Sequence, residues 1–188
     1  MAVETFFLMG FRAMSDMIKE IFPPGEDNAL ANVMKELEGD NLLNVIENSL
    51  RKLKDIAFED EYLRFHIIKQ LEPAFGHKII LKMDPVKPIL IIFNKTKDIF
   101  EIKWATDQNI TECAGIVFPF NLFKRFLVED LDVLRLITEN KVYFEKFLDL
   151  DDIIVRALLG FTSAFFLNED FKERVIKELN SIIKTMSS

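Results

Sequence analysis

The chain has 188 residues, and its 31 acidic and 24 basic side chains give a formal net charge of −7 at neutral pH. This length suits one domain with a full core. The acidic balance, without a Lys/Arg-rich cluster, argues against nucleic acid and anionic membrane surfaces as partners. The one cysteine, Cys113, cannot form an internal disulfide, and the longest uncharged stretch, residues 157–168, is too short to cross a membrane. We expect a cytoplasmic protein that is not an integral membrane protein.

The first 75 residues carry the periodicity of helices. Apolar spacing predicts a helix over 3–22, which Pro23 and Pro24 end, and a second helix over about 30–37, which ends at Gly39. Asp40 is expected to cap a third helix. The predicted apolar stripe of that helix is Leu43, Ile46, Leu50, Leu53 and Ala57. With a fourth helix over about 59–71, residues 1–75 are interpreted as a helical extension or cap.

The apolar period changes from helix to strand after residue 76. Alternation over 78–83 predicts a half-buried strand, and the continuous apolar run 89–93 predicts a strand covered on both faces. The polar residues 94–98 then form a hairpin loop to an antiparallel strand over 100–104. A further strand is expected over 110–118.

The remaining residues predict helices around one more strand. Pro119 suits the start of a helix, whose apolar stripe is Phe120, Phe123 and Leu127. A short helical piece over 131–137, a strand over 141–147 and an apolar helix over 153–166 follow, and Asn168 is expected to cap an amphipathic C-terminal helix. The sequence therefore predicts an α+β fold, with a mostly antiparallel sheet of about five strands covered by helices. Residues 76–188 form this α+β domain, and the whole chain is expected to be one compact unit.

Motifs for catalysis are missing. The six glycines form no phosphate-binding motif, and neither His66 nor His77 has the spacing of a metal ligand. His66 is interpreted as a partly buried helix residue, His77 as a loop residue, and Cys113 as a structural thiol. The carboxylates at 59–61 and 149–152 lie at predicted helix starts, where they serve as caps. We expect no cofactor, no metal and no catalytic residue, and an enzyme is the least favoured class.

The composition is unusual in its phenylalanine content. There are 19 phenylalanines against two tyrosines and one tryptophan, and eleven of the 19 lie between Phe93 and Phe166. A phenylalanine ring brings apolar area without the polar group that tyrosine and tryptophan must satisfy when buried. Two interpretations stay open at this stage: a genome rich in A and T, or a core or cavity built for apolar contact.

The order of predicted elements over about 78–160 resembles that of the sterol carrier protein 2 family. The resemblance includes the helix of residues 119–127 and the strand of residues 140–146, where Val142 and Phe144 hold the two apolar positions of the family's strand. Asn140 stands where the family has a glycine. The resemblance implies an apolar tunnel between sheet and helices for a fatty acyl, sterol-like or isoprenoid lipid, and no catalytic residue. The candidate lining residues are Phe100, Ile102, Trp104, Phe120, Phe123, Leu127, Phe144, Leu158 and Phe165.

Two functions follow from these features. The first is non-enzymatic binding of a hydrophobic small molecule or lipid in an apolar cavity between sheet and helices. The alternative is a protein-interaction or regulatory module with a solid core, which forms a homodimer or docks a protein partner through its amphipathic helices. The alternative predicts exposed phenylalanines, for which the candidates are Phe6, Phe7, Phe11 and Phe171.

Overall fold

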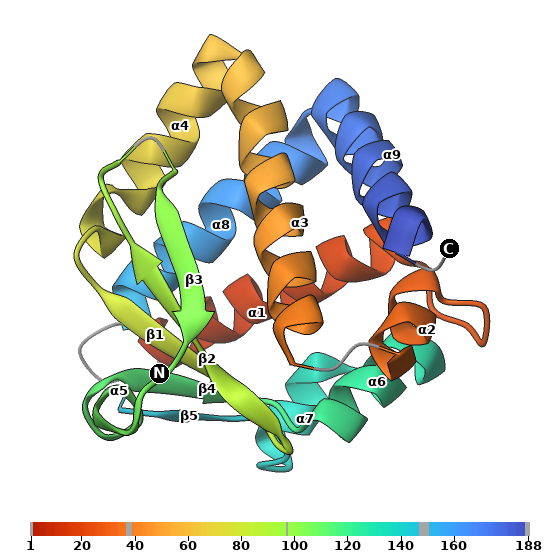
Figure 1. Cartoon of the computed structure of the whole chain (residues 1–188). Helices are drawn as coiled ribbons and strands as arrows, with labels where there is room; N and C mark the ends of the chain where they lie inside the picture. The colour runs from red at the N-terminus through yellow and green to blue at the C-terminus, as the bar shows by residue number, and fades with distance from the viewer. Residues whose placement is uncertain (1, 37–38, 97, 147–150, 187–188) are drawn as a thin grey trace.

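The computed structural model describes residues 2–36, 39–96, 98–146 and 151–186, without the side chains of residues 2–7, 35, 36, 151, 152 and 154. It confirms the α+β class, because helices surround one five-stranded sheet (Figure 1). The two short pieces 37–38 and 147–150 and the residues 1, 97, 187 and 188 lie outside this description.

The first 75 residues form α1 (Ala2–Ile21), α2 (Ala29–Glu36), α3 (Asp40–Glu59), α4 (Glu61–Leu71) and a 3-10 turn, Glu72–Ala74. The Asp60 side chain caps α4, since its Oδ1 accepts a hydrogen bond from the Leu63 amide at 2.8 Å. The prediction for Asp40 was wrong. Gly39 holds the cap position of α3 without a side-chain bond, and Asp40 instead accepts a hydrogen bond from the Trp104 indole at 2.6 Å.

The sheet contains β1 (Lys78–Met83), β2 (Val86–Phe93), β3 (Phe100–Trp104), β4 (Ala114–Val117) and β5 (Tyr143–Glu145). The spatial order is β3-β2-β1-β4-β5. β1 and β4 run parallel, and the other neighbouring strands run antiparallel. The expected mostly antiparallel sheet of about five strands is confirmed.

The predicted strand over 110–118 was wrong in its first half. Residues 107–112 form the helix α5 (Asp107–Glu112), and only Ala114–Val117 are extended. The cause is a local capping box, in which the Thr106 hydroxyl accepts from the Asn109 amide and the Asn109 side chain accepts from the Thr106 amide. α5 then covers one side of the sheet, so that Ile80 and Leu90 are buried there against Ile110. The strand over 78–83, which was expected to be half-buried, is therefore also covered at Ile80 on its second side.

The remaining helices are α6 (Phe120–Glu129), α7 (Val133–Thr138), α8 (Asp151–Leu167) and α9 (Glu169–Met186). The expected cap of α9 is confirmed, since Asn168 Oδ1 accepts from the Phe171 amide at 2.9 Å. β5 is shorter than the expected strand, because Val142 is held by the α7 end, where its amide donates to the Leu136 carbonyl at 3.1 Å. Residue 147, the end of the predicted strand, lies outside the described residues.

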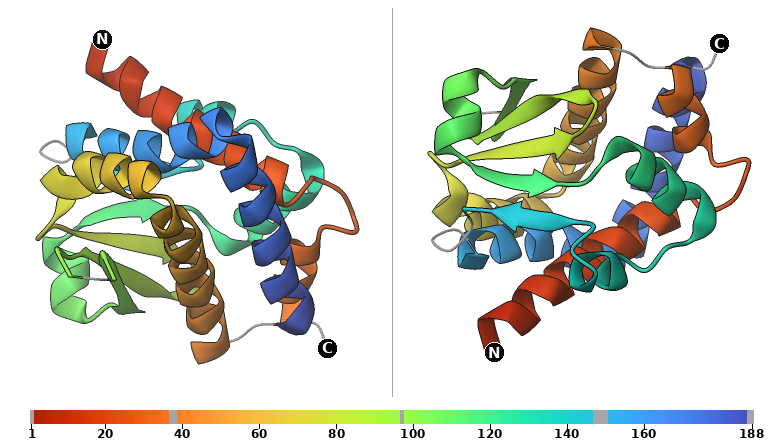
Figure 2. Two further views of the ribbon diagram at one scale, coloured as in Figure 1. Left: turned by 90° about the horizontal axis from the view of Figure 1, so that it is seen from above. Right: turned by 90° about the horizontal axis from the view of Figure 1, so that it is seen from below.

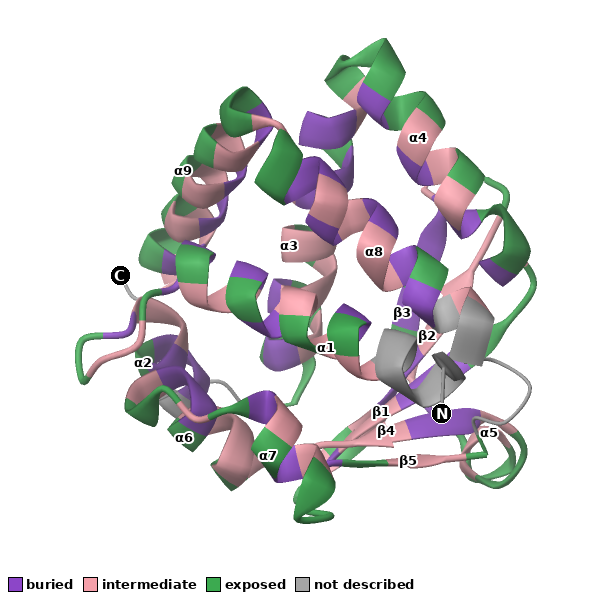
Figure 3. Ribbon diagram, turned by 180° about the vertical axis from the view of Figure 1, so that it is seen from behind, coloured by how far each residue is buried: buried purple, intermediate pink, exposed green. Residues whose placement is uncertain are grey.

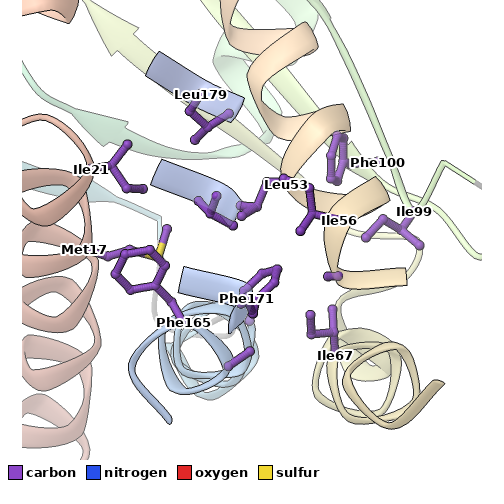
Figure 4. Packing of buried hydrophobic residues seen from close by; sticks show 14 of the residues in the cluster. Met17, Ile21, Leu53, Ile56, Ile67, Ile99, Phe100, Phe165, Phe171 and Leu179 are labelled. Atoms are coloured by element: carbon purple, nitrogen blue, oxygen red, sulfur yellow. The ribbon is translucent and has the colours of Figure 1, made fainter. Parts of the chain in front are cut away.

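Helices α1, α3 and α8 lie on one side of the sheet, and α5 lies on the other (Figures 1 and 2). The largest core cluster joins α1, α3 and α4 to α8, α9 and the sheet. Figure 4 shows Met17 of α1 beside Phe165 of α8, and Ile56 of α3 near Ile67 of α4. The helices of residues 1–75 thus share one core with the α+β part of the chain.

Candidate functional site

One side of the sheet is apolar from edge to edge. The pairing register places on this side Ile79, Leu81, Ile89, Ile91, Phe93, Phe100, Ile102, Trp104, Ala114, Ile116 and Phe144. We call it the helix-facing side, because its members share core clusters with residues of α1, α3 and α8. The opposite side carries charged residues, including the ion pair between Lys82 and Glu145.

Burial along the helix-facing side is uneven. Ile89 is 1% exposed and Phe100 and Ile102 are also buried, whereas Leu81 and Ile91 on the two central strands stay half-buried. In Figure 3, strands β1, β2 and β4 carry half-buried stretches although helices lie over this side. The middle of a covered sheet is normally packed to the density of an organic crystal. Leu81 and Ile91 are thus less completely covered than their neighbours Ile79 and Ile89 on the same side.

Helix α3 carries two apolar stripes, and the second of them is half-buried and lies toward the centre of the helix-facing side. Leu42, Val45 and Ile56 are buried, whereas the predicted stripe residues Leu43, Ile46 and Leu50 are only half-buried. Leu53 and Ala57 of the predicted stripe are buried, and the other three pack against the same core cluster from a half-buried position.

Polar contacts between α3 and the sheet fix the orientation of this second stripe at both of its ends. The Asp40 side chain is bound to Trp104 of β3, and Lys54 lies 3.5 Å from Asp98 in the β2–β3 loop. Leu43, Ile46 and Leu50 lie between these two ties on the same side of the helix, since residues three and four apart share a helix face. Half-buried apolar side chains of α3 and of the sheet thus face one another.

Helices α1 and α8 complete the surroundings. The rings of Phe11 in α1 and Phe144 in β5 have centroids 4.7 Å apart, and both pack with Leu158 of α8 around buried Ile79 and Ala114. We define the candidate site as the half-buried apolar residues Met14, Ile18, Leu43, Ile46, Leu50, Leu81, Ile91, Phe93, Ile116, Phe144, Leu158 and Phe161, together with Phe11. These residues lie on helices α1, α3 and α8 and on strands β1, β2, β4 and β5. None of them is charged.

Polar pairs flank the α3 stripe of the candidate site at both of its ends. Trp104 and Asp40 form a hydrogen-bonded pair at the start of α3, and the Lys87 ammonium lies 6.0 Å from the centroid of the Trp104 ring. The strongest pKa shift is at the protein surface, where hydrogen bonds from Lys141 and then Arg135 lower the pKa of Glu139 to about 2. The hydrogen-bonded pair of Trp104 and Asp40 therefore marks the β3 edge of the candidate site.

The nine residues predicted to line a cavity fall into three separate clusters. The first contains Phe100, Ile102, Trp104 and Phe165, of which only Trp104 is half-buried. The second gathers Leu127, Phe120 and Phe123 around α6, where the Phe118 and Phe123 rings pack edge to face at 5.1 Å. The third brings Phe144 and Leu158 together in the candidate site.

The centre of the helix-facing side was not among the predicted lining positions. Leu81 and Ile91 were not named as lining residues, and neither was Phe11. The available signal was the strand alternation itself, because Leu81 and Ile91 share a face with the predicted lining residue Ile102 once the hairpin register is known. Burial at these positions depends on how the helices pack, which alternation does not report.

Residues with catalytic or metal-binding chemistry lie apart from one another. His66 is half-buried in α4, 3.3 Å from the Ser163 hydroxyl, and His77 is exposed before β1, as expected for both. Cys113 is half-buried at the end of α5. Within the described residues, no group of three or more His, Cys, Asp or Glu side chains could hold a metal ion. Asp149 and the side chains of Asp151 and Asp152 lie outside the description.

The four phenylalanines that were predicted to be exposed differ in their burial. Phe171 is buried and Phe11 is half-buried, while the side chains of Phe6 and Phe7 are outside the description. Two surface hollows occur away from the sheet, one along α9 near Ser181 and one at the α1–α2 turn near Asn28. No helix in the described part of the chain has the length and apolar character needed to cross a membrane.

No protein-family model, curated protein or solved structure matches this chain.

Proposed function

We propose that this protein binds a hydrophobic small molecule, of the fatty acyl, sterol-like or isoprenoid class, without catalysing a reaction. The ligand lies between the helix-facing side of the sheet and helices α1, α3 and α8. One observation carries the proposal: Leu81 and Ile91 remain half-buried at the centre of a helix-covered sheet, opposite the half-buried stripe of α3.

An apolar region that is left unfilled carries a free-energy cost. An apolar space inside a protein destabilises the fold by about 24 cal/mol for each Å³ of residual volume. An apolar ligand removes that cost and gains about 0.8 kcal/mol for each methylene taken from water. Burial of about ten methylenes corresponds to roughly 8 kcal/mol, which is a micromolar dissociation constant before ordering costs.

The chemistry of the lining agrees with this ligand class. Phe11, Phe93, Phe144 and Phe161 supply area and shape, and no ring among them carries a polar group that would need a partner. The hydrogen-bonded pair of Trp104 and Asp40 lies at the edge, where a polar end of a lipid would lie. An apolar lining with a small number of polar groups that fix the orientation of the ligand is typical of small-molecule sites.

The proposal is tested first on protein purified without denaturation. Native mass spectrometry is expected to show a bound species, and solvent extraction is expected to release an apolar compound. After the compound is removed, a fluorescent fatty acid is expected to bind with a stoichiometry of one. The emission of Trp104, the single tryptophan, reports this binding because the ring lies at the edge of the site.

A negative result would be equally clear. The proposal is contradicted if the native mass equals that of the polypeptide alone and if a fatty acid, a sterol and an isoprenoid alcohol all fail to bind. In that case Trp104 emission would stay unchanged in every titration. That outcome favours the alternative of a solid core with a docking function.

A further inference from the structure

A group of large apolar side chains is exposed at one end of the α4–α8 helix pair. Tyr62 and Phe65 of α4 are 77% and 66% exposed, and Phe166 and Leu167 of α8 are 41% and 85% exposed. We call these four residues the end patch. They share no residue with the candidate site.

The end patch is continuous because α4 and α8 are antiparallel and in contact. His66 lies 3.3 Å from Ser163, and a Cβ atom on Gly160 would lie 2.8 Å from Cβ of Gln70. Tyr62 is one turn before His66, and Leu167 is one turn after Ser163. Because α4 and α8 run in opposite directions (Figure 1), Tyr62 near the start of α4 and Leu167 at the end of α8 lie at the same end of the pair.

The size of the end patch is that of a functional surface. With about 200 Å² for each ring, the exposed fractions give an apolar area on the order of 500 Å². A single patch of this area is at the upper end for monomers and is often functional. It also matches the apolar centre of a standard interface, which buries about 800 Å² on each partner.

The charges around the end patch indicate what covers it. Residues 59–64, at the α3–α4 junction, and residues 169–174, at the start of α9, contain six acidic and three basic side chains. Two of the three basic side chains are already paired, Lys172 with Glu20 at 2.6 Å and Arg174 with Glu59 at 2.5 Å. The rim is therefore negative, which opposes pairing with a second copy of the same surface and adsorption to anionic lipids.

We propose that the end patch docks a basic amphipathic helix of a partner protein. Tyr62 and Phe65, three residues apart, share one face of α4, and Phe166 and Leu167 are exposed at the end of the adjacent α8. The small Ser163 lies in the seam between the two helices. The apolar face of the partner helix lies along the end patch, and its basic residues meet the acidic rim, including Glu61 and Glu173.

The test uses two labelled synthetic peptides and the full chain. One peptide is an amphipathic helix of leucine and lysine, and the other has glutamate in place of lysine. Fluorescence anisotropy is expected to show binding of the lysine peptide and no binding of the glutamate peptide. The double variant F65S/L167S is expected to weaken binding at least tenfold, and Met9→Ser, which changes a 57% exposed methionine on α1, is expected to leave it unchanged.

A second variant keeps the test decisive if F65S/L167S does not fold. E61K/E173K changes only exposed charges, and it is expected to weaken the lysine peptide several-fold and to strengthen the glutamate peptide. Equal affinity of wild type and F65S/L167S overturns the proposal, as does equal binding of both peptides. Patch-dependent binding to phosphatidylcholine vesicles, or patch-dependent dimers, without peptide binding also overturns it.

Discussion

The half-burial of Ile91 makes a direct prediction about the same substitution at two neighbouring positions. Ile89 and Ile91 lie two residues apart in β2, and both point to the helix-facing side, where they pair with Trp104 and Ile102. Ile89 is 1% exposed, whereas Ile91 is half-buried. Replacing each by phenylalanine therefore tests for free space at one position and uses the other as the matched control.

The expected stability changes differ in size. Ile89→Phe forces a larger side chain into a closed core, which costs about 1–3 kcal/mol. For a chain of this length each kcal/mol lowers Tm by roughly 2–4 °C, so Tm falls by about 2–12 °C. Ile91→Phe places its ring in the region proposed for the ligand, and the ligand-free protein is expected to keep its Tm within about 2 °C.

Ligand affinity is expected to change in the opposite order. The Ile91→Phe ring displaces about two methylenes of the ligand at about 0.8 kcal/mol each, which weakens binding roughly tenfold. Thermal unfolding followed by circular dichroism and titration with a fluorescent fatty acid measure the two effects. If Ile91→Phe destabilises the protein as much as Ile89→Phe, the centre of the sheet is a closed core and the reasoning is refuted.

Three further predictions concern a helix cap, a core position and a surface ion pair. Asp60→Ala removes the cap of α4 and is expected to cost about 1 kcal/mol in urea unfolding, and an unchanged midpoint would contradict the capping role. Phe165→Ala is expected to cost about 3–5 kcal/mol because the ring is fully buried, whereas Phe166→Ala, next to it and 41% exposed, should cost only about 1 kcal/mol through the lost ring contact with Phe165. Glu139 has a lowered pKa of about 2, so its ion pairing is complete above the ordinary carboxyl pKa and is lost as the pH falls through about 2. Lys141→Ala should raise this pKa toward its ordinary value in an NMR titration, and an unmoved titration would exclude Lys141 as the cause.

The periodicity of the sequence predicted most helices and strands correctly because each long element carries its own signal. The amphipathic α9 has Phe171, Val175, Leu179 and Ile183 buried along one side, and Asn168 caps it as expected. The failure at 110–118 has the opposite origin. Alternation favoured a strand there, but the two hydrogen bonds between Thr106 and Asn109 form locally and start a helix.

The candidate site was less accessible to prediction because it depends on small rotations of packed elements. On α3 the stripe through Leu42 and Val45 enters the core, while the stripe through Leu43 and Ile46 stays half-buried. Adjacent residues on a helix point about 100° apart, so Leu42 and Leu43 belong to two different stripes. Both stripes are apolar, and the sequence alone does not show which of them is the more deeply buried. Packing against α9 on one side and β3 on the other decides which stripe is buried.

The phenylalanines that dominate the composition divide into three structural roles. Phe126, Phe165 and Phe171 are buried core residues, the set around Phe144 lines the candidate site, and the exposed Phe166 belongs to the end patch. One residue type serves all three because it contributes area without a polar group.

This division has a consequence for selectivity at the candidate site. A pocket that recognises its ligand by shape alone separates ligands that differ by one methylene by only about 1–3 kcal/mol. A hydroxyl carried deep into the site would lose its bonds to water and find no partner among the phenylalanine rings, at a cost of roughly 1–3 kcal/mol. The site should therefore accept a range of apolar chain lengths and reject ligands with polar groups away from the Trp104 end.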